Sequence, residues 1–321
     1  MKSARHDDDS PIIELVDGAL AVTEAVHIAM ARVMPPAMAD QIASHLGRFA
    51  STIRPSKRRT LEELYRTIVG DTAGMPRAED YVPTLIGTLL QQRMIYARLG
   101  ANADWQPREF VIEGADAIAA ERAKGRAVVL WLLPTEMIAH LVRMACRHNG
   151  WPLPFLSHWQ HGLSRSTIGR ATINARDCRI DALFGPRMVM EQNDTRTALA
   201  SAQAILNDGG MVGFRGIGWS KRPVSFPLFE GWMHLAFGAP VTARRTGASL
   251  FVASAGRTEI GFRVRFEQIE GHAERPLEEL GAEFAAKLEA TAKASPSLWS
   301  VKSRQWQANA PDADEAGSPA S

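Results

Sequence analysis

The sequence predicts an α/β protein in which a largely parallel sheet is flanked by helices and covered by an N-terminal helical layer. Residues 11–105 show helical spacing almost throughout, with breaks at Pro35-Pro36 and Pro76. After this region, short apolar runs alternate with helical segments, an order typical of parallel strands joined by crossover helices. The run from Ala127 to Leu133 contains no polar residue and therefore indicates a strand buried on both faces.

The same patterns predict the individual elements. Polar and apolar residues alternate over 262–269 (FRVRFEQI). One antiparallel edge strand is expected in the otherwise parallel sheet. Strands are predicted at 110–113, 127–133, 153–156, 211–215, 249–253 and 262–269. Helices are predicted at 115–124, 135–148, 164–175, 194–207, 232–246 and 276–293.

The chain of 321 residues is long enough for one large domain. We expect a single domain over residues 11–306, in which 11–105 forms the helical layer and 110–306 the α/β core. Residues 1–10 and 307–321 are expected to be disordered, since the C-terminal tail is rich in Ala, Asp, Pro and Ser.

Composition excludes several classes of function. A formal net charge of +2 is too small to indicate nucleic-acid binding. Two cysteines, Cys146 and Cys178, stand without CxxC spacing, which indicates neither a disulfide framework nor a zinc site and fits a reducing compartment. No acid or cysteine stands near His158 and His161 with ligand spacing, so no metal is predicted.

The N-terminal sequence predicts neither a signal peptide nor a membrane span. Acidic residues stand where a signal peptide needs a basic region, and charges interrupt the apolar stretch at 11–34. That stretch is typical of an amphipathic helix that packs on the core or binds a membrane interface. The basic run at 54–59 is either a solvated face or a site for membrane phosphates. We expect a cytoplasmic protein, with peripheral contact at the cytoplasmic face of the inner membrane as the open alternative.

The functional site is expected at the carboxyl ends of two strands of the sheet. Ligands of such sheets bind at the carboxyl ends of strands, here just after Leu133 and just after Arg215. Glu136 and His140 follow the first of these strands at i,i+4 spacing, which puts a carboxylate and an imidazole on one face of the predicted helix. Such a pair is able to deprotonate a hydroxyl. The purely structural alternatives are that Glu136 only compensates the helix dipole and that His140 is a core histidine.

Basic residues follow other strands of the core. Lys221 and Arg222 either contact a phosphate or carboxylate or form a solvated pair. The Gly-rich stretch at 209–218 lacks the spacing of a dinucleotide fingerprint. Arg170 and Arg176 lie on a segment expected near the ligand edge, where an arginine binds an anionic head group or polarises a thioester carbonyl.

Four stretches of the chain carry a family resemblance. The chain resembles the late acyltransferases of lipid A biosynthesis, the lauroyl/myristoyl transferase family within the lysophospholipid acyltransferase group. The resemblance covers most of residues 15–306 and implies a glycerolipid acyltransferase-like fold. The stretches are residues 58–61, 110–133, 226–257, and the closing Pro, Trp and Arg-Trp signature within 295–306.

The resemblance implies transfer of a fatty acyl chain from acyl-carrier protein or coenzyme A to a hydroxyl or amine of a lipid or glycolipid acceptor. The acyl thioester is then a co-substrate, and no further cofactor is implied. The stretch from Phe226 resembles the family's substrate loop, so Phe229 and Gly231 are expected to contact substrate, as is one of Arg170 and Arg176.

The chain departs from the family at its catalytic pair. The family places a His after the buried strand and an Asp or Glu five positions further on, with four residues between them. Aligned without a gap, these positions hold Pro134 and Ala139, and an alignment that uses Glu136 as the acid puts Trp131 at the His position. Arg215-Gly216 stands where a further acid is expected, and Arg215 is a candidate for binding the oxyanion or the substrate.

Two functions from different classes therefore remain open. The first is an acyltransferase in which Glu136 and His140 replace the family's acid/base pair. The second is a catalytically degenerate member that acts as a lipid-binding or partner-binding module. A serine hydrolase using Ser220 is a third alternative, and it requires a His within hydrogen-bond reach of the Ser220 hydroxyl.

Overall fold

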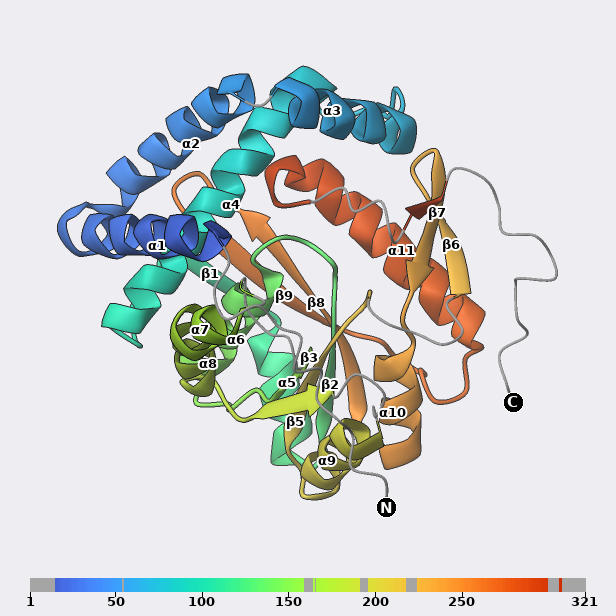
Figure 1. Cartoon of the computed structure of the whole chain (residues 1–321). Coiled ribbons are helices and arrows are strands. Elements are labelled where there is room, and N and C mark those ends of the chain that lie inside the picture. Colours follow the sequence, from blue (N-terminus) through green and yellow to red (C-terminus); the bar gives the residue numbers. More distant parts are fainter. Residues whose placement is uncertain are drawn as a thin grey trace, which may run out of the picture.

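The predicted α/β class with an N-terminal helical layer is confirmed by a computed structural model of the chain (Figure 1). It describes residues 15–53, 55–158, 164, 166–190, 196–217, 224–299 and 306–307. The residues expected to be disordered, 1–10 and 307–321, lie outside this description except for Gln307.

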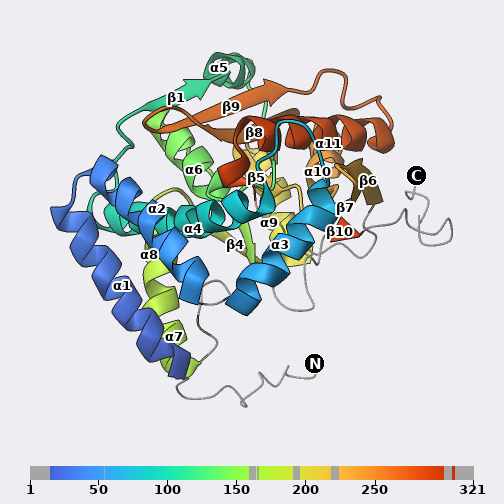
Figure 2. The same cartoon turned by 90° about the horizontal axis from the view of Figure 1, so that it is seen from above.

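Four helices form the N-terminal layer: α1 (Leu15–Val33), α2 (Pro36–Ile53), α3 (Pro55–Val69) and α4 (Ala78–Ala101). Small residues let α2 approach α4 closely, since a Cβ at Gly47 would lie 2.6 Å from the backbone N of Gly87 and the carbonyl O of Pro83. Figure 2 shows α1 and α2 along the outer side of α4. None of the described helices combines the length and apolar content that a membrane span requires.

The main sheet has seven strands in the order β1-β9-β8-β2-β5-β3-β4. Five of them are mutually parallel: β2 (Val128–Leu132), β3 (Phe155–His158), β4 (Arg187–Met190), β5 (Met211–Arg215) and β8 (Ser249–Arg257). The other two strands, β9 (Phe262–Gln268) and β1 (Phe110–Glu113), run antiparallel to these five and parallel to each other. One antiparallel edge strand was expected; β1 lies at an edge of the sheet, and β9 is a second antiparallel strand inside it.

Side chains of β2 alternate between two core clusters, as a strand buried on both faces requires. Leu130 and Leu132 pack with α6 (Ile138–His148) and α5 (Ala115–Ala123), whereas Trp131 and Leu133 pack with α9 (Arg196–Asn207), α10 (Gly238–Thr246) and α11 (Leu277–Ala294). All residues of β2 are fully buried. At roughly 25 cal/mol per Å² of apolar surface, this strand is a main source of the hydrophobic stability.

A second sheet, which the sequence did not predict, has the order β10-β7-β6. Its strands are β6 (Val224–Leu228), β7 (Gly231–Leu235) and β10 (Trp306–Gln307). The helix predicted at 232–246 was therefore wrong over its first part: β7 occupies it, and α10 begins only at Gly238. Alternating burial along β7 is the period-two pattern that favours a strand.

Two other predicted helices have different bounds. The helix predicted at 164–175 is a turn of α7 (Thr167–Gly169), a π-helical segment (Arg170–Asn174) and α8 (Ala175–Ala182). The helix predicted from Thr135 begins three residues later, at Ile138. Met137 has a left-handed backbone (φ 61°), which no helix interior allows.

Candidate active site

The carboxyl ends of β2 and β5 lie side by side at the centre of the sheet. Leu132 and Arg215 are register partners of these two parallel strands, and the Gly216 N–H donates to the Leu132 carbonyl at 2.9 Å. The two strand ends that the sequence analysis identified are therefore adjacent in the structure. Open α/β sheets bind their ligands at such carboxyl ends.

Glu136 lies in the loop after β2 rather than on α6. Its backbone N–H donates to the carbonyl of Leu298 at 2.5 Å, and Thr135 forms a bridge with Trp299. The C-terminal segment thus fixes this loop. Because Glu136 precedes the helix, the i,i+4 argument that paired it with His140 was wrong.

Arg215 brings a positive charge to the same edge. Desolvation lowers the pKa of its guanidinium, and the positive charge of Arg143 lowers this pKa further. The negative charge of Glu136 raises it. The side chain is exposed, so we expect the desolvation to be modest, and the group stays charged. Arg215 makes no hydrogen bond or ion pair with the residues described by the structure, which leaves its guanidinium open to an anion.

His140 is half-buried against the N-terminal layer. Its ring meets Tyr96 of α4 edge-on with 4.3 Å between ring centroids, and its Nδ1 is buried without a hydrogen-bond partner. Burial lowers the pKa of the imidazole to about 3, helped by the charges of Arg143, Arg215 and Arg93 and opposed by that of Asp181. The ring is therefore neutral at physiological pH and a weak base.

A buried polar network surrounds His140. Arg143, one turn further along α6, pairs with Asp181 of α8, which also accepts a hydrogen bond from the Tyr96 hydroxyl at 2.8 Å. Burial and the Asp181 charge raise the pKa of Tyr96 well above its ordinary value. Arg93 of α4 pairs with Asp177 at 3.4 Å. The network ties α4, α6 and α8 together.

Sequence reasoning missed this network. A usable signal was present, because Asp177 and Asp181 are one helical turn apart, as are Arg93 and Tyr96, so each pair shares a helix face. The sequence does not show that these faces of α4 and α8 pack on each other, because more than 80 residues separate the paired side chains.

The tryptophan that a shifted alignment puts at the catalytic position belongs to the core. Trp131 stacks on Phe284 of α11 with 4.0 Å between ring centroids, and it is fully buried. Pro134 and Ala139, at the unshifted positions, carry no ionisable group. No described residue therefore restores the family's His at its own place.

Phe229 lies in the turn between β6 and β7, and Gly231 is the first residue of β7. Phe229 has a left-handed backbone (φ 53°), and its ring meets Trp299 edge-on at 5.1 Å. A Cβ at Gly231 would lie 2.0 Å from the ring of Trp306, so glycine is needed for this packing. Phe229 packs on the core cluster opposite to that of Tyr96, and the described residues do not bring it together with His140.

The other predicted binding residues lie elsewhere or outside the description. Arg170 begins the π-helical segment, and the Arg176 guanidinium approaches α4 at Gly100. Lys221, Arg222, Ser220 and His161 lie outside the described residues, as does the side chain of His158. The Ser220 and His158/His161 hypotheses therefore stay predictions.

Within the described residues, no group of three or more His, Cys, Asp or Glu side chains could hold a metal ion. Cys146 is buried, and burial raises the pKa of its thiol, which makes it unreactive. Comparison of the chain with family models and with curated proteins gives no match.

Proposed function

We propose that this chain is an acyltransferase of the kind represented by the late acyltransferases of lipid A biosynthesis. It moves a fatty acyl chain from an acyl-carrier protein or coenzyme A thioester to a hydroxyl or amine of a lipid or glycolipid acceptor. The observation that carries the proposal is that Glu136 follows β2 and Arg215 ends β5, two adjacent central parallel strands, so that the charge of Glu136 acts on the Arg215 guanidinium. A carboxylate and, nearby, a guanidinium that has no hydrogen-bond or ion-pair partner among the described residues supply a base and an anion site together.

In this mechanism Glu136 takes the proton of the acceptor hydroxyl while that oxygen attacks the thioester carbonyl carbon. The new C–O bond forms, and the carbonyl oxygen becomes an oxyanion beside Arg215. Collapse of the tetrahedral intermediate breaks the C–S bond, and the leaving thiolate takes the proton from Glu136. Atoms and charge balance without any other cofactor.

His140 takes no part in proton transfer in this scheme. With its pKa lowered to about 3, it would be a poor base at neutral pH, where an efficient base has a pKa near the working pH. Its ring packs on Tyr96, which anchors the start of α6 to the N-terminal layer. The sequence-based pairing of His140 with Glu136 as acid and base is thus replaced by Glu136 with Arg215.

A second candidate is a binding module that keeps the acyl-donor site and has lost transfer. The observation that favours it is the absence of an ionisable group at Pro134 and Ala139, together with the neutral His140. Such a module needs Arg215 for an anionic group but makes no use of Glu136 as a base.

Mass spectrometry of products from a panel of acyl thioesters and hydroxylated lipid acceptors separates the two candidates. Glu136→Gln should lower the transfer rate by roughly 10²- to 10⁴-fold, while calorimetry still detects donor binding. The matched variant His140→Gln should change the rate by less than about threefold, since it removes no base in this scheme. A Glu136→Gln variant that transfers at the wild-type rate would refute the mechanism. Donor binding without product in the wild type would establish the binding module.

The acceptor suggests where the protein acts. We propose a cytoplasmic protein that contacts the cytoplasmic face of the inner membrane peripherally. The outer sides of α1 and α2 expose apolar side chains, among them Val33 (82% exposed) and Phe49 (62%). Exposed apolar side chains near basic residues are typical of helices that lie in a membrane interface.

A further inference from the structure

The hairpin of β6 and β7 carries a serine and a histidine in hydrogen-bond contact. Ser225 and His234 are register partners of these antiparallel strands, and 2.7 Å separates the Ser225 Oγ from the His234 Nδ1. Nucleophiles and the general bases that activate them lie about 2.6–3.2 Å apart. The contact therefore has the geometry of an activated serine.

The pair lies on the outer face of the small sheet. Phe226, Leu228 and Met233 belong to the core cluster that includes residues of α11, and Figure 1 shows the hairpin beside this helix. Because side chains alternate between the two faces of a strand, Ser225 and His234 point the other way. Both residues are half-buried. The inner face supplies the packing of the hairpin, whereas the pair contributes little to it.

The His234 imidazole is able to act as a base. Its Nε2 has no protein partner in the described part of the chain and is not buried, so water can hold a proton on Nε2. In that tautomer the His234 Nδ1 accepts the hydrogen bond of the Ser225 hydroxyl. No described carboxylate contacts His234, and a histidine base without an acid to orient it is less effective. We therefore expect a rate enhancement of roughly 10²-fold, the lower end of the usual range.

Backbone N–H groups without a ladder partner lie close to the Ser225 hydroxyl. As far as the structure describes the small sheet, β6 is its edge strand, so every second residue of β6 turns its N–H away from β7. These groups belong either to Ser225 or to its neighbours Val224 and Phe226. None of the three donates to a described residue outside the ladder. A free N–H beside a reacting carbonyl stabilises the oxyanion that forms there.

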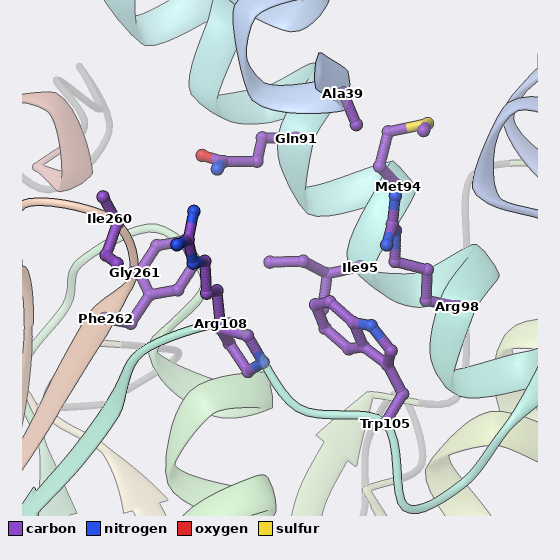
Figure 3. A pocket seen from close by; sticks show the side chains of 11 residues that line it. Ala39, Gln91, Met94, Ile95, Arg98, Trp105, Arg108, Ile260, Gly261 and Phe262 are labelled. Atoms are coloured by element: carbon purple, nitrogen blue, oxygen red, sulfur yellow. The ribbon is translucent and has the colours of Figure 1, made fainter. Parts of the chain in front are cut away.

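The pair is accessible to a larger molecule than the cavity beside α4 is. Figure 3 shows that cavity, which α4, the segment before β1 and the start of β9 enclose. Its volume is about 20 Å³, room for one water-sized group, and its walls hold no Ser, Thr or Cys that could act as a nucleophile. Ser225 and His234, half-buried on the face of a sheet, are reached from the solvent side.

We propose that Ser225 is a covalent acceptor for the acyl group of thioesters or activated oxygen esters, with His234 as its general base. The His234 Nδ1 takes the hydroxyl proton while the Ser225 Oγ forms a bond with the acyl carbonyl carbon. The C–S or C–O bond of the donor then breaks, and the leaving group takes the proton from His234. Water hydrolyses the serine ester, which regenerates the hydroxyl and releases the carboxylic acid. This activity goes beyond transfer to a lipid acceptor and does not depend on it.

Labelling with a hexyl fluorophosphonate tests the pair, because this reagent leaves a stable phosphonyl group on an activated serine. Peptide mapping of the labelled wild type should assign the group to Ser225. His234→Gln should react roughly 10²-fold more slowly, since a glutamine amide accepts the hydroxyl hydrogen bond but takes no proton. The measurement contains no lipid acceptor, so its result is independent of the transfer that Glu136 and Arg215 are proposed to carry out.

The matched control is Ser201→Ala. Ser201 is an exposed serine of α9 whose hydroxyl donates to the Thr197 carbonyl at 3.0 Å and contacts no described imidazole. Its loss should leave the labelling rate unchanged, and urea unfolding of each variant checks that the fold is retained. An unlabelled wild type, a label at a residue other than Ser225, or equal rates for His234→Gln and the wild type would overturn the proposal.

Two acyl donors distinguish the sources of the acyl group. Release of coenzyme A from hexanoyl-coenzyme A and of p-nitrophenolate from p-nitrophenyl hexanoate is measured for the wild type and Ser225→Ala. If thioesters are donors, Ser225→Ala should lower both rates, whereas a loss of p-nitrophenolate release alone assigns the site to oxygen esters. If Ser225→Ala lowers neither rate, Ser225 accepts no acyl group and the proposal is wrong.

Discussion

The buried pair of Arg143 and Asp181 should carry a large share of the stability of the site. Their side chains are 7% and 1% exposed, and Asp181 also accepts from the Tyr96 hydroxyl. Asp181→Ala leaves a buried guanidinium without its counter-ion, which costs about 3–5 kcal/mol. The hydroxyl that loses its acceptor adds about 1–3 kcal/mol. Because the two losses share one site and do not add fully, we expect about 4–6 kcal/mol.

Urea unfolding followed by far-UV circular dichroism measures this change. The matched control is Asp104→Ala, which breaks another ion pair of α6, that of Arg147 with Asp104 at 2.9 Å. Asp104 is 81% exposed, so its loss should cost less than about 1 kcal/mol. Equal destabilisation by the two variants would refute the reasoning. The double variant Arg143→Met/Asp181→Leu should recover most of the loss, because it removes the uncompensated charge.

Two further predictions concern pH and membranes. Since burial lowers the pKa of His140 to about 3 from an unfolded value near 6.5, the unfolded state takes up its proton first as pH falls. The free energy of unfolding should therefore decrease by about 1.4 kcal/mol more between pH 7.5 and 5.5 in the wild type than in His140→Gln; equal decreases in urea titrations would contradict the neutral ring. The double variant Val33→Ser/Phe49→Ser should sediment less with anionic vesicles than wild type, whereas Leu183→Ser, on another exposed surface, should not; unchanged sedimentation would exclude α1 and α2 as the contact.

The fold class was predictable because long apolar runs determine it. The all-apolar stretch from Ala127 to Leu133 indicates a central strand, because it is too short for a helix of ordinary size. The hairpin of β6 and β7 was not predictable in the same way. Its turn uses Phe229 with a positive φ, a conformation that favours glycine or asparagine, so the usual turn signal is missing.

The adjacent strand ends of the candidate site were predictable, but the surroundings of its side chains were not. The edges after β2 and β5 follow from the strand pattern, whereas the start of α6 depends on Met137, which sequence rules would put inside a helix. The environment of His140 depends on Tyr96 and Asp181, which lie about 40 residues away on either side. No local pattern reports a desolvation that distant elements cause.

The C-terminal segment fixes the loop that follows β2. Tyr81 donates to the Trp299 carbonyl at 2.7 Å, and Leu298 accepts from the Glu136 backbone, so the loop after β2 is held from two sides. With its backbone fixed in this way, a proline at 134 is tolerated, because a proline supplies no N–H and the neighbouring donors already have their partners. The carboxylate of Glu136 therefore belongs to a fixed loop, four residues beyond Leu132, the register partner of Arg215. In the proposed mechanism this carboxylate is the base, because the helix that follows contributes only an imidazole whose pKa burial lowers to about 3.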